Sequence, residues 1–316
     1  MTDIESGSDR AWTFRGIDAA TMRQLSKEMP ASELWSLLLG VIEQRAAKRT
    51  IAAVADQWRE DRFVQPAAVD PRVLLHIDQL LFAVAHSFQA VELSPLAPLG
   101  TCSVVAPTSQ NRVVSTVRGT EVVSDPTNVL ALECGRRLRE DATQSLKFAS
   151  SHRCIRAQPF PKLPGFAAHF RMFCLATAGH ETKDQAFTVD ALADHIKTHL
   201  LGLASLRQNG YALSAPSVTL LSTAARRSLA DRIAGQLPDD VAVTHEVLTK
   251  PYYNGLRFMI NVAGSAGDIP LIDGGAFDWV AKLASNRKLV FVASAIGSQL
   301  IAHLFRREVN EPSSRQ

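Results

Sequence analysis

The stretch Leu271–Phe305 limits the possible folds more than any other part of this 316-residue chain. Gly274 and Gly275 predict a turn, because glycine tolerates positive φ angles and a close approach of another group to the backbone. Apolar residues at helical spacing follow and predict a short amphipathic helix. Leu289–Ala293 is rich in β-forming residues and too short for a second helix, so it predicts a strand. Gly297 allows a tight turn into a final buried helix.

This order of elements resembles motif 3 of class II aminoacyl-tRNA synthetases, in the version found in histidyl-tRNA synthetases and their paralogues. In that family a Gly-Gly-Arg-Tyr-Asp element, a helix and an apolar strand lead into a Gly-Leu-Glu-Arg helix. The matching residues here run from Gly274 to Asp278 and from Gly297 to Leu300. Two arginines of the family are replaced. Ala276 stands in the Gly-Gly element, and Leu300 stands where the family's arginine handles ATP.

The segment KPYYNGLRF, which begins at Lys250, resembles a second signature of histidyl-tRNA synthetases. Tyr252, Tyr253 and Gly255 match the family residues. Leu248 occupies the position of an arginine that helps to activate histidine in the family, which argues against the same reaction here. The alternative reading of the two tyrosines is an ordinary strand, where aromatic residues are common.

Residues 153–177 predict two paired strands joined by a loop, and they resemble motif 2 of the same family. The resemblance gives Arg156 the task of holding a substrate carboxylate or an α-phosphate, for which a planar guanidinium group is suited. Gln158 replaces an acid of the family pattern, and Ala168 replaces an arginine that contacts the base. The loop at 159–165 is rich in proline and fits either a rigid binding loop or a plain hairpin turn.

Residues 112–124 alternate in the manner of paired strands, and a helix is predicted after them. At the junction, Asp125 and Thr127 resemble an element of the histidyl-type core that contacts the ammonium group of the amino acid. A carboxylate suits that role because a charge-assisted hydrogen bond to an ammonium group is short and strong. The alternative is structural, with Asp125 or Ser124 as the helix N-cap and Pro126 in the first turn.

The chain before the core predicts a helical N-terminal extension at 1–70, followed by the core at 71–308 and a disordered tail at 309–316. Apolar residues recur at helical spacing in this extension, for example at Leu34 and Leu38. It contains no catalytic constellation. We expect the extension to pack on the core, and a surface for a partner is the alternative.

A helix that starts at Pro71 and runs to about Ser87 is predicted next, followed by an extended segment that ends at Pro95. This order resembles motif 1, which builds the dimer interface of class II synthetases. The resemblance therefore implies a homodimer formed through residues near 71–100.

Composition excludes several other classes of protein. An apolar content of 46% and a charged content of 21% are those of a globular protein, and a net charge of +3 does not by itself argue for nucleic acid. The cysteines are widely spaced and form no CxxC pair, which argues against zinc and against disulfides and fits a reducing cytoplasm. They are Cys102, Cys134, Cys154 and Cys174. The absence of a signal peptide and of an uninterrupted apolar span predicts a cytoplasmic protein outside the membrane.

The resemblance covers roughly residues 70–307 and implies an α+β fold, a class II synthetase-like antiparallel sheet of about six strands flanked by helices. It also implies a substrate-binding site without a metal ligand set. The residues of this site are Asp125, Thr127, Arg156, Gln158, Tyr252, Tyr253, Gly255, Gly274 and Gly275.

Three functions remain open at this point. The first is a non-catalytic histidyl-tRNA synthetase-like paralogue that binds an amino acid or a related small molecule. It would act as a regulatory subunit of the ATP phosphoribosyltransferase type, in histidine biosynthesis, with a catalytic partner enzyme. The second is a ligase that adenylates an amino acid and transfers it to a small molecule or carrier protein, and only this reading requires ATP and Mg²⁺. The third is a structural interaction module.

Charging of tRNA is not expected, because no anticodon-binding domain follows motif 3 in this sequence. Several arginines of the family are also missing. Each lost cationic contact to the reacting phosphate would raise the barrier to adenylation by about 3 kcal/mol.

Overall fold

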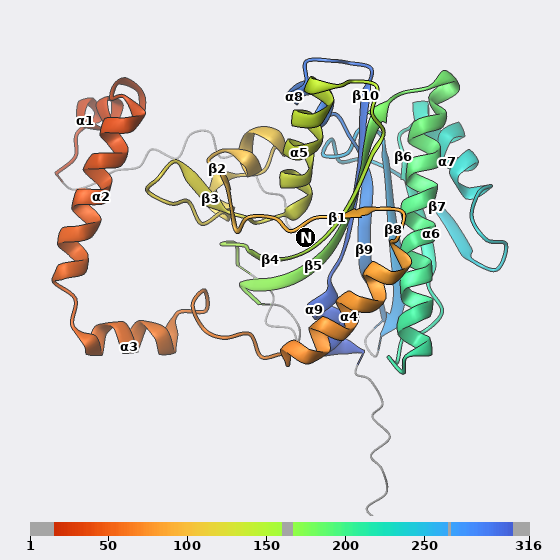
Figure 1. The fold of residues 1–316 in the computed structure, drawn as a ribbon, viewed down its shortest axis with the longest axis horizontal. Coiled ribbons are helices and arrows are strands. Elements are labelled where there is room, and N and C mark those ends of the chain that lie inside the picture. The colour runs from red at the N-terminus through yellow and green to blue at the C-terminus, as the bar shows by residue number, and fades with distance from the viewer. Residues whose placement is uncertain (1–15, 160–166, 265–266, 306–316) are drawn as a thin grey trace, which may run out of the picture.

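The computed structural model describes residues 16–159, 167–264 and 267–305, and an eight-stranded sheet lies at its centre. The strands of this sheet are β1 (Gln89–Ala90), β4 (Leu146–Ile155), β5 (His169–His180), β6 (Ser217–Ser222), β7 (Ala242–Val247), β8 (Leu256–Gly264), β9 (Gly267–Phe277) and β10 (Leu289–Ile296). Their order is β1-β4-β5-β10-β9-β8-β6-β7 (Figure 1).

The strands from β4 to β6 in this order run antiparallel to one another, whereas at the two edges β1 pairs in parallel with β4 and β7 pairs in parallel with β6. The α+β fold with a mainly antiparallel sheet, predicted from the sequence, is confirmed. The hairpin predicted at 153–177 is formed by β4 and β5, which pair over their whole length. The two parallel edge strands are an addition to the prediction.

The pairing predicted within residues 112–124 forms over a short stretch. Val122 N donates to Val114 O at 2.9 Å, Thr116 N donates to Thr120 O at 2.8 Å, and Ser115 and Glu121 form a single bridge. The only regular strand in this segment, β3 (Thr120–Val122), also pairs with β2 (Leu96–Pro98) in a separate two-stranded sheet. Glu121 ties β3 to the segment around residue 100 as well, because its buried carboxylate accepts hydrogen bonds from Gly100 N at 2.9 Å and Cys102 N at 2.8 Å.

Helices cover both faces of the sheet. They are α4 (Pro71–Val84), α5 (Pro126–Glu140), α6 (Ala186–Gln208), α7 (Arg227–Ala234), α8 (Trp279–Leu283) and α9 (Ser298–Leu304). Shorter helical turns are η1 (Gln24–Glu28), η2 (Thr101–Val105), η3 (Gln110–Arg112), η4 (Lys183–Gln185) and η5 (Ala224–Arg226). Helices α4 and α5 begin alike, with Asp70 or Asp125 as the N-cap followed by a proline, a combination that favours helix initiation.

Successive side chains of β10 point to opposite faces of the sheet, and the apolar residues form one core on each face. Val292 points into a core shared with α4, α6, α7 and α9, whereas Phe291 points to the opposite face and packs with α5 and α8. Figure 1 shows α5 and α8 on one side of the sheet and α6 on the other. Because burial of one large apolar side chain contributes about 1.5–3 kcal/mol, these two layers fix the sheet between the helices.

A chain of polar side chains crosses the core between α6 and the sheet. The hydroxyl of Ser294 lies 2.9 Å from His195 Nδ1 and 2.8 Å from His199 Nε2, and Thr177 Oγ1 lies 2.9 Å from His195 Nε2. Burial lowers the pKa of both imidazoles, that of His199 to about 3. Both rings are therefore neutral, and their hydrogen bonds satisfy polar atoms inside an apolar layer.

The C-terminal stretch forms α8, β10 and α9, as its sequence predicts. The turn predicted at Gly274 and Gly275 is wrong, since both residues lie inside β9 with ordinary φ angles. Their small size is used for close approach instead. A Cβ atom at Gly274 would lie 2.4 Å from Ser294 Cβ, and one at Gly275 would lie 2.4 Å from the Tyr253 ring.

The N-terminal extension forms helices that project from one side of the sheet (Figure 1). They are α1 (Ala19–Arg23), α2 (Ala31–Ala47) and α3 (Ile51–Glu60), and none of them contains a buried residue. Ile51 is 92% exposed and Trp58 is 56% exposed. The predicted packing on the core is therefore wrong for most of the extension. The helices of the core already cover both faces of the sheet, and among the described residues no surface buries these apolar side chains.

The extension contacts the rest of the chain at separate places. The Trp35 ring of α2 lies against Gly119, and beyond α3 the carbonyl of Gln65 lies 2.7 Å from His169 Nε2. None of the helices in the described part of the chain is long and apolar enough to cross a membrane. The tail at 309–316 and the loop residues at 160–165, both subjects of the sequence predictions, lie outside the described residues.

Candidate functional site

A pocket of about 400 Å³ lies where β4 ends, between the N-terminus of α5 and strands β8 and β9. Five of the nine site residues predicted from the sequence line it. They are Asp125, Arg156, Gln158, Tyr252 and Tyr253. These residues come from separate segments of the chain, so the sheet and α5 bring them together only in the folded protein.

Asp125 and Arg156 form a charged pair at one wall of this pocket, with Arg156 Nη2 3.4 Å from Asp125 Oδ2. The other carboxylate oxygen, Oδ1, accepts hydrogen bonds from the backbone N–H of Thr127 at 3.0 Å and from its hydroxyl at 2.7 Å. Arg156 Nε donates to the carbonyl of Ser124 at 3.0 Å. Asp125 therefore has two roles at once: its Oδ1 atom caps α5, while its Oδ2 atom faces Arg156 in the pocket wall.

A second charged pair lies on the strands, where Arg257 of β8 holds Asp273 of β9 through Nε at 2.9 Å and Nη2 at 2.7 Å. The Tyr253 hydroxyl donates to the same carboxylate at 2.8 Å. Burial raises the pKa of Tyr252 and of Tyr253, so both phenols are neutral hydrogen-bond donors at neutral pH. This wall therefore presents an ordered set of charges and hydroxyls to a ligand.

The four remaining predicted residues do not line the pocket but lie directly behind it. Thr127 holds Asp125 through its hydroxyl, and Gly275 leaves room for the Tyr253 ring. Gly255 has a positive φ of 76°, and a Cβ atom there would lie 2.7 Å from Arg226 Cδ. Gly274 lies against Ser294 and Phe258.

Several lining residues were not predicted as site residues. They include Cys102, Arg112, Lys250, Arg257 and Asp273. Asp273 had a visible signal, since it is a charged residue set between an apolar run and two glycines in the most constrained stretch of the chain. Arg112 had no comparable signal in the sequence.

Nucleophilic and metal chemistry find little support in this pocket. Burial raises the pKa of the Cys102 thiol, so it stays protonated and is a poor nucleophile. In the ranges that the structure describes, no group of three or more His, Cys, Asp or Glu side chains is arranged to hold a metal ion. Leu300, which stands at the position of the family's ATP-handling arginine, lies in α9, packs against the core and does not line the pocket.

The comparisons with known proteins agree on the fold. No protein-family model and no curated protein matches this sequence. Among solved structures, an ATP phosphoribosyltransferase regulatory subunit/histidyl-tRNA synthetase from Bacillus halodurans C superposes with a TM-score of 0.54 at 14% identity, over 75% of this chain and 81% of that chain.

Two histidyl-tRNA synthetases give the same result. The S. aureus enzyme has a TM-score of 0.54 at 11% identity over 73% of this chain and 64% of its own. The enzyme from Nostoc sp. PCC 7120 has a TM-score of 0.54 at 13% identity over 75% of this chain and 72% of its own. The core therefore has the fold of a class II aminoacyl-tRNA synthetase. Within that class, its structural neighbours include histidyl-tRNA synthetases and an ATP phosphoribosyltransferase regulatory subunit.

Proposed function

We propose that this protein is a non-catalytic histidyl-tRNA synthetase-like paralogue that binds an amino acid or a closely related small molecule. The Asp125–Arg156 pair is the observation that carries the proposal. The head group of an amino acid is itself a pair of opposite charges. Its ammonium group would meet Asp125 Oδ2, and its carboxylate would meet the guanidinium group of Arg156.

The long 3.4 Å contact between these two side chains favours this exchange. A contact of that length is weak, so a ligand that replaces it with two short charge-assisted bonds gains more than it disrupts. The side chain of the ligand would then extend toward Tyr252, Tyr253 and Asp273, which line the same pocket. Polar groups on that wall favour a ligand with its own donors or acceptors.

The regulatory role is proposed by analogy with the neighbour whose name includes an ATP phosphoribosyltransferase regulatory subunit. In this role the protein would bind a catalytic partner enzyme of histidine biosynthesis and make the activity of that enzyme depend on the amino acid.

A homodimer through residues near 71–100 belongs to the same proposal. In this segment Leu75 is 64% exposed and Leu96 is 42% exposed, which favours burial against a second chain.

The cysteines at 102, 134, 154 and 174 are free and buried, which supports a reducing, cytoplasmic location.

An adenylating ligase is the second candidate, and one observation favours it. Arg112 and Lys250 line the pocket in addition to Arg156, and neither makes an ion pair within the described residues. These two cations would compensate in part for the arginines that the sequence lacks. ATP and Mg²⁺ are required only under this alternative.

Calorimetry with each standard amino acid, followed by the variant Arg156→Gln, tests the binding proposal. We expect one amino acid to bind and its affinity to fall by about tenfold in the variant, because a charged hydrogen-bond partner is lost. Arg136→Gln, on the exposed side of α5, is the control and should bind normally. Binding of no amino acid by the unmodified protein would remove the proposal and leave the structural module.

Amino-acid-dependent pyrophosphate exchange separates the regulator from the ligase. The regulatory proposal predicts no exchange above background with any standard amino acid.

The proposed role of the protein as a regulatory partner is tested by adding it to an ATP phosphoribosyltransferase catalytic subunit from the same organism. Activity that becomes sensitive to the bound amino acid is the expected result, and exchange activity would establish the ligase instead.

A further inference from the structure

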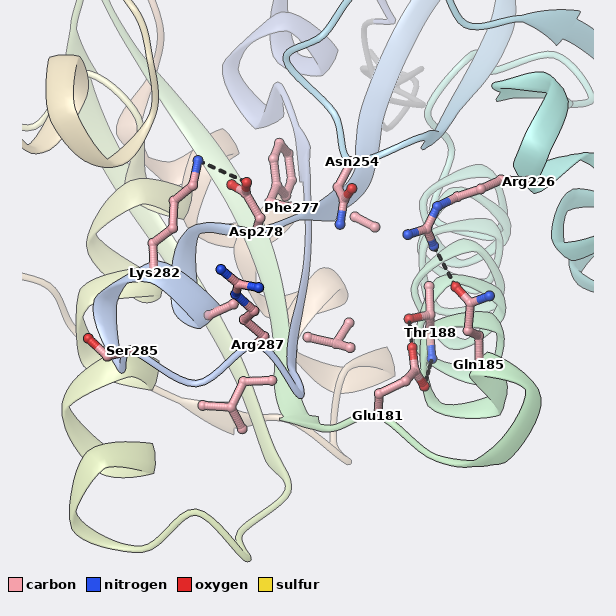
Figure 2. A pocket seen from close by; sticks show the side chains of 14 residues that line it. Glu181, Gln185, Thr188, Arg226, Asn254, Phe277, Asp278, Lys282, Ser285 and Arg287 are labelled. Atoms are coloured by element: carbon pink, nitrogen blue, oxygen red, sulfur yellow. Dashed lines mark hydrogen bonds and ion pairs between the residues drawn. The ribbon is translucent and has the colours of Figure 1, made fainter.

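A second and larger pocket lies on the other side of the 251–255 turn. Its volume is about 730 Å³, within the range of sites for small molecules. Figure 2 shows side chains from the start of α6, from η5, from the end of β9 and from α8 converging on it. The turn separates the two pockets: Tyr252 and Tyr253 line the first, and Asn254 lines the second.

The carboxylates of the second pocket are already occupied. Glu181 accepts hydrogen bonds from the backbone N–H groups of Thr182 and Thr188 and from the Thr188 hydroxyl, so it caps the start of α6. Asp278 forms an ion pair with Lys282 at 2.8 Å. Within the described residues neither acid therefore forms an ion pair with an arginine of the pocket.

Two arginines in the same pocket form no ion pair with an acid among the residues that the structure describes. Arg226 Nη1 donates to the neutral side chain of Gln185 at 2.7 Å. Arg287 makes no hydrogen bond or ion pair with any residue in the described part of the chain. Figure 2 shows these guanidinium groups on opposite sides of the pocket, with the amide of Asn254 between them. Two guanidinium groups and an amide form a set of donors suited to an anion with several oxygens.

The floor of the pocket is apolar and buried. Ala276, Phe277 and Leu289 line it and are each less than a tenth exposed. Three residues with positive φ angles border it: Asp184 at 56°, Gln185 at 57° and Ser285 at 52°, which are the only non-glycine residues with such angles in the described ranges. Non-glycine residues adopt this conformation at an energetic cost and are found more often where a site is being shaped.

We infer that this pocket is a second ligand site, distinct from the proposed amino-acid site, and that it binds a small molecule carrying a phosphate, diphosphate or polycarboxylate group. The oxyanion group lies between Arg226 and Arg287 and accepts from the amide of Asn254. The remainder of the ligand lies over Phe277 and Leu289. The helix N-terminus takes no part in binding, because Glu181 already caps it.

Titration calorimetry of the full chain with inorganic pyrophosphate, inorganic phosphate and citrate tests this inference, and the panel distinguishes phosphates from carboxylates. At least one of these anions is expected to bind saturably. Arg287→Gln and Arg226→Gln should each weaken that binding by about tenfold, since each removes one charged donor to the anion.

Lys288→Gln is the matched control for Arg287→Gln. It removes a neighbouring exposed cation that does not line the pocket, and it should change the affinity by less than about twofold. Arg156→Gln, in the first pocket, should likewise have no effect. Melting curves without ligand verify that each variant is folded. If Arg226→Gln is unstable, Arg287→Gln still tests the inference, because Arg287 is exposed and its substitution should not disturb the fold.

Three results would overturn the inference. One is the absence of saturable binding of all three anions. Another is equal weakening in Lys288→Gln and Arg287→Gln, which would indicate attraction by net charge alone. The third is loss of anion binding in Arg156→Gln with retention in Arg287→Gln, which would assign the anion to the first pocket.

Discussion

The two pockets share the 251–255 turn but hold their charges in opposite ways. In the first pocket, two of the cations are paired with acids that line the same pocket, as Arg156 with Asp125 and Arg257 with Asp273. In the second pocket one acid caps a helix and the other pairs with Lys282, and the two arginines form no ion pair with any of the described residues. The first arrangement suits a ligand with both charges, and the second suits an anion.

The difference shows that the number of charged residues does not by itself define the ligand of a pocket. Both pockets contain acids and bases, and both are lined partly by the aromatic group around Phe277, whose ring lies 5.1 Å from Tyr253 and 5.6 Å from Tyr252. What differs is which of the charges already have partners inside the protein. Each prediction below tests whether the two pockets depend on the same part of the fold or respond independently.

Acid is expected to abolish both pockets together, because the buried imidazoles of His195 and His199 stabilise the sheet that carries them. Their pKa values in the folded protein lie below the ordinary value of 6.5, that of His199 at about 3. The unfolded chain therefore binds protons first as the pH falls below 6.5, and stability is full above that value. His199 should lower the free energy of unfolding by about 2 kcal/mol at pH 5, and His195 should lower it further in the same direction.

Urea denaturation at pH 7.5 and pH 5 measures this loss. In His199→Gln the pH-dependent loss should be smaller by about 2 kcal/mol, because His199 no longer takes up a proton on unfolding. His86→Gln is the control, since His86 is exposed, and it should leave the loss unchanged. A stability that is the same at both pH values would contradict the prediction.

Gly275→Ala is expected to disturb the two pockets at once. The added Cβ atom would lie 2.4 Å from the Tyr253 ring and 2.5 Å from the Leu256 carbonyl oxygen. The backbone cannot yield cheaply there, so we expect a destabilisation of about 2–3 kcal/mol together with weaker binding in both pockets. Thermal and urea unfolding measure the first effect, and calorimetry measures the second.

Gly40→Ala is the matched control, since nothing lies within 4 Å of the added atom and Gly40 lies inside α2. It should stabilise the protein by about 0.5–1 kcal/mol, as alanine does in a helix. A Gly275→Ala variant as stable as the unmodified protein would show that the crowding around Tyr253 is relieved by a small movement.

Sequence alone could predict the parts of this molecule that depend on neighbours along the chain. The strand, helices and Gly297 turn of the C-terminal stretch follow from local periodicity, and so does the capped start of α5 at Asp125. Five pocket residues were predicted because they stand at positions of the family's motifs, which follow one another in the expected order. The pairing of Arg257 with Asp273 was missed because it depends on the register between β8 and β9, which no local pattern encodes.

The second pocket and the position of the extension could not be predicted for a related reason. Arg226 and Arg287 lie in polar segments that have the composition of ordinary surface, and only the fold brings them to one cavity. The spacing of Leu34 and Leu38 predicts a helix but contains no information about which surface, if any, covers it. The Gly274–Gly275 pair was misassigned because glycine serves both turns and close strand packing.

Asp125→Asn separates the two roles of this side chain and affects only the first pocket. Asparagine can still cap α5 through its side-chain oxygen, so the stability should change by less than about 0.5 kcal/mol. The negative charge opposite the ligand ammonium is lost, and we expect the affinity for the bound amino acid to fall by about tenfold. Anion binding in the second pocket should be unchanged.

Thr127→Val provides the reverse change, because it removes the hydroxyl that donates to Asp125 Oδ1 and keeps the carboxylate. It should lower the stability by about 1 kcal/mol, the net value of one hydrogen bond, with a smaller effect on affinity. If Asp125→Asn changes stability and not affinity, Asp125 is a helix cap alone.

Tyr253→Phe is expected to have the smallest effect and to refine the comparison at the wall between the pockets. The variant removes the hydroxyl that donates to Asp273 at 2.8 Å but keeps the ring that packs on Phe277. Asp273 keeps its two hydrogen bonds from Arg257, so the stability should fall by only about 1 kcal/mol.

Tyr252→Phe is the matched control, because the Tyr252 hydroxyl makes no hydrogen bond within the described residues. The stability of this variant should be close to that of the unmodified protein. Calorimetry should find weaker amino-acid binding in Tyr253→Phe and unchanged anion binding. Equal weakening in both pockets would mean that the 251–255 turn couples them, since the ring contact with Phe277 is the same in the variant.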